Sequence, residues 1–270
     1  MELSPSVDVA RRNNVVERGN PLGQPMVFAH GFGCSQATWR LVAPHFERDY
    51  RVILFDHVGA GMSDLSAYDR AKYDSLDGYG SDVLDILEAL DLRDVIFVGH
   101  SVSAMIGVLA ANRDPSRFAQ LVLIGPSPRY INDVDYIGGF EQADIDGLID
   151  SIDANYLGWS AVVAPMMMRN PDRPELGEDL TASFCSTDPA IARQFAHVTF
   201  LSDNRDDLPL VSVPTVVIQS SDDVIAPLEV GHYVHRSIPG SRLQVLPTTG
   251  HIPILSGPDT VVSEIRRALE

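Results

Sequence analysis

The chain has 270 residues, which is enough for one sizeable α/β domain or for a domain with an inserted subdomain. Its hydrophobic content of 45% and charged content of 21% are ordinary for a soluble globular protein, and no apolar run approaches membrane-spanning length. The formal net charge of −17 argues against nucleic acid or an anionic membrane as a partner, because both are polyanions.

Cysteine usage and the N-terminal residues bear on the compartment. Cys34 and Cys185 are the two cysteines and cannot build a disulfide framework, which suggests a reducing environment. The first residues lack a charged segment followed by an apolar core, so the sequence predicts no signal peptide. We therefore expect a cytoplasmic protein.

Buried strands are predicted in the first third of the chain. Residues 15–16 predict a short strand, and the apolar runs at 25–30 and 50–56 predict strands covered on both faces. The second of these strands runs into Phe32, which has a glycine on either side. Because glycines permit tight backbone turns, the Phe32 N–H is a candidate donor to an oxyanion.

A serine lies at a turn between the next strand and a helix. Residues 95–98 form an apolar run without alternation, and residues 104–111 predict an apolar helix. The turn between them, residues 99–103, fits the pattern G-x-S-x-small, in which a strained turn exposes the hydroxyl of Ser101. The Val102 N–H at the positive helix N-terminus is the second candidate oxyanion donor. Ser103 occupies the position where glycine is usual.

The alternation of strands and helices predicts a mostly parallel sheet with helices on both faces. This alternation stops at about residue 130 and resumes after residue 200. The residues between predict only helices, rich in apolar and aromatic side chains. We expect residues 1–129 and 201–270 to form an α/β core and residues 130–200 to form a helical cap over the carboxyl ends of the strands, where such sheets bind ligands. The substrate would then be small and mainly apolar.

An acid and a histidine follow the last two predicted strands. Asp222 and Asp223 come just after a strand at 214–219, and His251 follows a strand at 242–246. The order serine, aspartate, histidine is that of α/β-hydrolases. In this chemistry the histidine removes the serine proton and the aspartate orients the ring. The residues by themselves leave both aspartates open.

Five segments carry a resemblance that covers nearly the whole chain: residues 55–64, 99–107, 126–130, 184–189 and 250–251. They resemble RsbQ-type regulators of the bacterial sigma-B stress response and are similar to plant strigolactone and karrikin receptors, α/β-hydrolases with a four-helix V-shaped cap. The resemblance implies a nucleophile, a base and two oxyanion donors at Ser101, His251, Phe32 and Val102. It also selects Asp223 as the acid, because in the family a proline, here Pro227, follows the acid four residues later.

The substrate pocket is predicted from the same resemblance. It implies that Tyr130, Trp159 and Phe200 line the pocket, and Val163 stands where the plant receptors tend to have an aromatic residue. His100, next to the candidate nucleophile, lines the pocket or serves only in packing.

Two functions follow. The first is a hydrolase that cleaves a small hydrophobic ester or a butenolide-like lactone; carbon–carbon bond hydrolysis by the same residues is a weaker alternative. The second is a stress-signalling regulator that binds such a ligand with little turnover, for which the resemblance implies a phosphatase with a PAS sensor domain as partner. The sequence predicts no cofactor and no metal site, since His232 and His235 have no third ligand nearby.

Overall fold

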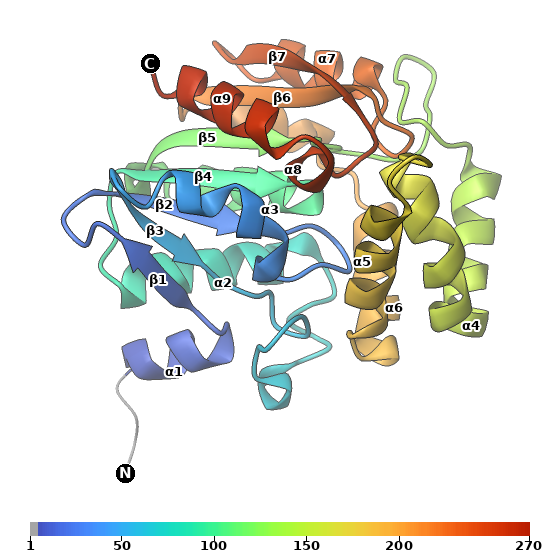
Figure 1. Ribbon diagram of the computed structural model, residues 1–270, viewed down its shortest axis with the longest axis horizontal. Coiled ribbons are helices and arrows are strands. Elements are labelled where there is room, and N and C mark those ends of the chain that lie inside the picture. Colours follow the sequence, from blue (N-terminus) through green and yellow to red (C-terminus); the bar gives the residue numbers. More distant parts are fainter. Residues whose placement is uncertain (1–4) are drawn as a thin grey trace.

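The computed structural model describes residues 5–270, and a seven-stranded sheet runs through their centre in the order β1-β3-β2-β4-β5-β6-β7 (Figure 1). Only β1 runs antiparallel to its neighbour; the other pairings are parallel. The strands are β1 (Val16–Gly19), β2 (Gln24–Ala29), β3 (Tyr50–Leu54), β4 (Val95–His100), β5 (Phe118–Ile124), β6 (Thr215–Asp222) and β7 (Arg242–Thr249). The α/β-hydrolase fold predicted from the sequence is therefore confirmed.

Helices separate most of the parallel strands, as right-handed crossovers require. In Figure 1, α9 lies in front of the sheet and α2 lies behind it. The helices are α1 (Pro5–Arg12), α2 (Leu76–Ala89), α3 (Val102–Arg113), α4 (Gln142–Met168), α5 (Pro174–Cys185), α6 (Pro189–Phe200), α7 (Leu228–Ser237), α8 (Pro253–Ser256) and α9 (Pro258–Ala268). None of the helices within residues 5–270 is long and apolar enough to cross a membrane.

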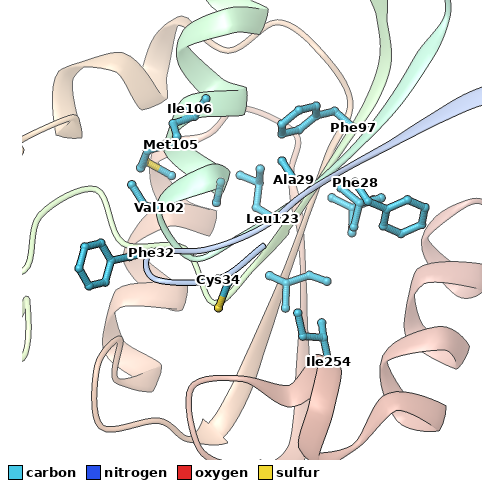
Figure 2. Close-up of a cluster of buried hydrophobic side chains, with 14 of the residues drawn as sticks. Phe28, Ala29, Phe32, Cys34, Phe97, Val102, Met105, Ile106, Leu123 and Ile254 are labelled. Carbon is cyan, nitrogen blue, oxygen red and sulfur yellow. The ribbon is translucent and has the colours of Figure 1, made fainter. Parts of the chain in front are cut away.

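Residues 102–111 of α3 are all buried, and the helix packs on the central strands. Figure 2 shows Val102, Met105 and Ile106 of this helix beside strand residues such as Leu123. The helix approaches β4 closely, because a Cβ at Gly107 would lie 2.4 Å from the Phe97 ring. This close approach packs the middle of α3 directly on β4.

Three helices, α4, α5 and α6, are inserted between β5 and β6, and we call them the inserted helices. They lie beyond the carboxyl ends of the strands (Figure 1). The longest, α4, is interrupted at Asn155, whose backbone is non-helical (φ −158°, ψ 84°). The Asn155 side-chain oxygen accepts from the Gly158 N–H at 3.0 Å, as at a helix start. The inserted helices therefore comprise four helical segments.

Candidate active site

Ser101 lies between β4 and α3 in a conformation that non-glycine residues rarely adopt (φ 57°, ψ −125°). The turn is tight, because a Cβ at Gly99 would come within 2.5 Å of the Ser103 carbonyl oxygen. The Ser101 N–H donates to the Ile124 carbonyl at 2.8 Å, which ties the turn to β5. The strain therefore places the side chain beyond the end of the sheet, as the G-x-S-x-small pattern predicts.

The structure brings Ser101, His251 and Asp223 together in one chain of hydrogen bonds. His251 Nε2 lies 2.8 Å from Ser101 Oγ, and His251 Nδ1 lies 2.8 Å from Asp223 Oδ2. These residues follow β4, β7 and β6, whose carboxyl ends share one edge of the sheet. All three are almost fully buried, so water competes little with these bonds.

The electrostatics of Asp223 decide where the proton on His251 lies. Burial acts to raise the pKa of this carboxyl, but His251 and the N–H groups of Ile225 and Ala226 outweigh it, so the pKa is lowered. An ionised carboxylate only accepts hydrogen bonds, so His251 Nδ1 carries the proton. His251 Nε2 is then bare and accepts from the Ser101 hydroxyl.

Asp222, the other candidate acid, points elsewhere. Its carboxylate pairs with Arg169 at 2.8 Å, and both side chains are about half exposed. Its backbone carbonyl accepts from the Gly250 N–H at 2.8 Å. Asp222 therefore braces the loop that carries His251 but does not touch the imidazole ring.

Two backbone N–H groups near Ser101 are unused. Among residues 5–270, neither the Phe32 N–H nor the Val102 N–H donates a hydrogen bond within the protein. Val102 is the first residue of α3, where the helix dipole favours negative charge. Gly31 keeps the first loop close to the turn, because a Cβ there would lie 2.9 Å from His100 Nδ1 and 3.2 Å from Ser101 Cβ.

His100 forms a hydrogen bond to the backbone of the loop that carries His251. Its Nε2 lies 2.9 Å from the backbone carbonyl of His251, and a carbonyl can only accept, so Nε2 carries the proton. Burial is the main cause that lowers the pKa of His100 to about 3. The ring is therefore neutral at physiological pH and positions His251 rather than exchanging protons.

A small cavity of about 10 Å³, roughly the room of one water molecule, adjoins Ser101. Its wall includes three of the predicted pocket residues, His100, Tyr130 and Phe200. Burial raises the pKa of the Cys34 thiol to about 11, so this further wall residue is a protonated thiol and no second nucleophile. The lining is Gly31, Phe32, Cys34, His100, Ser101, Tyr130, Met167, Thr199, Phe200, Ile225, His251 and Ile252.

Two predicted pocket residues do not line this cavity. Trp159 stacks on Phe184 at a ring-centroid distance of 5.8 Å, and the Phe32 ring contacts both of these rings. Phe32, which does line the cavity, therefore packs against Trp159, and in Figure 2 its ring points away from the strand residues. Val163 is a half-buried residue of α4 and does not line the cavity. The α4 residue that lines the cavity is Met167.

Six wall residues were not among the predicted site residues: Gly31 and Cys34 beside Phe32, and Ile225, Ile252, Met167 and Thr199. Ile225 and Ile252 lie within two positions of Asp223 and His251, so their proximity to these residues was a usable signal. Met167 and Thr199 come from the inserted helices, whose packing no local pattern reveals. The Met167 carbonyl also accepts from the His251 N–H at 2.9 Å, which joins α4 directly to the histidine loop.

A serine hydroxyl at a strand-to-helix turn, bonded to a histidine and a buried aspartate at the carboxyl edge of a mostly parallel sheet, defines a serine hydrolase of the α/β class. The chain belongs to the alpha/beta hydrolase fold family, whose sequence model matches residues 24–258.

Relatives span nearly the full chain. It is similar to a probable esterase of Oryza sativa subsp. japonica, with 42% identity over 91% of both chains. The "Strigolactone esterase D14" of Arabidopsis thaliana is 40% identical over 90% of this chain and 91% of its own. Among solved structures, a hydrolase from Oleispira antarctica superposes with a TM-score of 0.95 at 39% identity, covering 99% of this chain and 98% of its own.

Proposed function

We propose that the protein hydrolyses small, mainly apolar esters or butenolide-like lactones through an acyl-enzyme on Ser101. The observation that carries this proposal is the unbroken chain of hydrogen bonds from Asp223 through His251 to Ser101. Relatives at about 40% identity whose names include "esterase" support the same chemistry.

The geometry supports a direct sequence of steps. Ser101 Oγ attacks the carbonyl carbon while His251 Nε2 takes its proton, and Asp223 stabilises the imidazolium that forms. The oxyanion receives hydrogen bonds from the free N–H groups of Phe32 and Val102. His251 then donates its proton to the leaving oxygen, and a water molecule activated by the same nitrogen releases the acyl group.

In this proposal residues 130–200 act as a cap that must open. The cavity beside Ser101 has room for about one water molecule, so an ester enters only when wall side chains or the inserted helices move. The wall side chains from α4 and α6 are Met167, Thr199 and Phe200, and they are the parts of these helices that an entering ester would displace.

Intact-mass spectrometry with a p-nitrophenyl ester and with a butenolide tests the proposal. We expect an acyl adduct and turnover with the wild type and neither with Ser101→Ala. Ser263→Ala is the matched control, because this exposed hydroxyl lies on α9 and bonds only to the Asp259 carbonyl. Undiminished turnover by Ser101→Ala would refute the proposal.

The alternative function is a signalling regulator that binds a small hydrophobic ligand with little turnover. Relatives named as receptors favour it, such as the "Karrikin insensitive 2 receptor CA" of Petunia hybrida, which is 41% identical. A phosphatase with a PAS domain is then the proposed partner, on the motif resemblance. A stable adduct without turnover, together with capture of such a phosphatase, would select this function.

The cytoplasm remains the proposed compartment. Cys34 and Cys185 are both free thiols, and Cys185 is exposed. This state is the one that a reducing compartment maintains.

A further inference from the structure

Thr199 is a buried polar residue on the wall of the cavity beside Ser101. It lies on the inward face of α6 with Phe195, Ala196 and Phe200, and its relative exposure is 1%. Its Oγ1 has no hydrogen-bond partner among the described residues. A buried hydroxyl without a partner is rare in native proteins and calls for a physical explanation.

Two other buried or half-buried hydroxyls on the inserted helices are satisfied within their own helix. Thr181 Oγ1 donates to the Gly177 carbonyl at 2.8 Å, and Ser160 Oγ donates to the Tyr156 carbonyl at 2.7 Å. Each of these bonds reaches back four residues, the usual solution for a helical serine or threonine. Thr199 does not make the equivalent bond to Phe195, although it too lies within a helix. Its hydroxyl is therefore free to bond to whatever occupies the cavity.

Neighbouring polar groups on the wall do not use this hydroxyl. Ser101 and His251 bond to each other, and His100 Nε2 bonds to the His251 carbonyl. The remaining space has room for about one water molecule, which can bond to Thr199 before a substrate arrives. A substrate that expels this water must offer a replacement oxygen, or the hydroxyl stays unpaired.

We propose that Thr199 is a specificity-determining residue that donates a hydrogen bond to a second oxygen of the substrate, an ether or carbonyl oxygen apart from the scissile ester group. The inference rests on the proposed function and narrows its substrate class. Preferred substrates are oxygenated esters and lactones, and plain alkyl esters are poorer because they leave the Thr199 hydroxyl unpaired.

Matched pairs of p-nitrophenyl esters test this inference. Methoxyacetate against butanoate, and 3-methoxypropanoate against pentanoate, each exchange one ether oxygen for a methylene at constant shape. The measured quantity is the ratio of kcat/KM within each pair, compared between the wild type and Thr199→Val. This comparison cancels the different intrinsic reactivities of the esters.

Thr199→Val keeps the shape of the side chain and removes the hydroxyl. We expect the preference for the oxygenated ester to fall about 10-fold in at least one pair, which corresponds to one hydrogen bond. Thr199→Ser keeps the hydroxyl and should retain most of the preference. The Tm of Thr199→Val should not fall, because the variant removes an unpaired buried polar group.

An unchanged ratio in both pairs would overturn the inference. If kcat/KM also falls equally for both members of each pair, Thr199 has a purely structural role. If the wild type hydrolyses none of the esters, the proposed function fails instead. The role of Thr199 is then tested by calorimetry, which measures the Kd of each uncleaved ester for the wild type and for Thr199→Val. The ratio of Kd values within each pair replaces the ratio of kcat/KM.

Discussion

The Ser103 hydroxyl donates a hydrogen bond to the backbone carbonyl of His30 at 2.5 Å. Since its single proton is used there, it accepts from His57 Nε2, 2.7 Å away. Burial holds the pKa of His57 well below its usual value, so this ring is neutral and donates from Nε2. The hydrogen bond from Ser103 to the His30 carbonyl joins the end of β2, which leads to Phe32, with α3, which begins at Val102. These two segments carry the free N–H groups of Phe32 and Val102.

We expect Ser103→Ala to lower kcat about 10- to 100-fold with little change in KM. Complete loss of one oxyanion donor costs about 100- to 1,000-fold, and loosening the two segments should cost less. Steady-state kinetics and the affinity for a trifluoromethyl ketone, which forms a tetrahedral oxyanion, measure the effect. Ser160→Ala also removes a buried hydroxyl-to-carbonyl bond, but away from Ser101, and should leave kcat unchanged. Equal losses in the two variants would contradict the role given to Ser103.

The two adjacent aspartates are expected to differ sharply in their effect on turnover. Asp223→Asn places an amide against His251 Nδ1, which favours the tautomer with its proton on Nε2 and prevents that nitrogen from accepting the Ser101 proton. We expect kcat to fall about 10,000-fold, as for comparable triads. Asp222→Asn disturbs only the exposed pair with Arg169 and should change kcat less than about 3-fold. Rates of ester hydrolysis by the two variants measure the difference. A larger loss of kcat in Asp222→Asn than in Asp223→Asn would show that the wrong acid was assigned.

Alanine substitutions at two glycines with positive φ should distinguish the cost of backbone strain from the added cost of a steric clash. Gly240 (φ +69°) has open space around it, whereas a Cβ at Gly250 (φ +94°) would lie 2.1 Å from the Met168 carbonyl oxygen. We expect Gly240→Ala to lower the free energy of unfolding by about 1 kcal/mol, from the left-handed backbone alone. Gly250→Ala should lower the free energy of unfolding by about 3 kcal/mol, because a steric clash with the Met168 carbonyl adds to the same backbone strain.

Gly250→Ala should also reduce kcat, since the α4 end that it displaces accepts the His251 N–H through Met167. Urea unfolding and ester hydrolysis of both variants provide the measurements. Similar values for the two variants would mean that the end of α4 moves freely away from the histidine loop.

The buried His100 predicts a loss of stability in acid. Its folded pKa is lowered to about 3, so between pH 6.5 and 3 the unfolded chain binds a proton at this residue that the folded chain does not. Stability therefore falls as the pH drops, and His100 contributes a loss of about 2 kcal/mol between pH 7 and pH 5. Urea unfolding at both pH values should show a smaller acid loss for His100→Gln, whose amide can still donate to the His251 carbonyl. Parallel losses in the two proteins would contradict this prediction.

Local sequence patterns were sufficient for the sheet and for the strained serine. Apolar runs without alternation mark strands covered on both faces, and β2, β3 and β4 lie within a few residues of their predicted positions. The positions of Ser101 and His251 after strands also followed from the chain, because the carboxyl ends of parallel strands share one edge.

Contacts between distant segments needed the tertiary structure. Asp222 and Asp223 are chemically identical neighbours that local patterns leave open. The family resemblance selects Asp223, and the path of the loop shows that its carboxylate contacts His251 while that of Asp222 pairs with Arg169. Likewise, nothing near Thr199 in the sequence distinguishes a free hydroxyl from one bonded to its own helix. Strand periodicity is a local property of the chain, whereas hydrogen bonds and cavity walls depend on the packing of residues far apart in sequence. For this reason the sequence determined the sheet, the serine turn and, through the family resemblance, the choice of Asp223, and tertiary packing decided the contacts of the acid, the cavity wall and the bracing of the two free N–H groups.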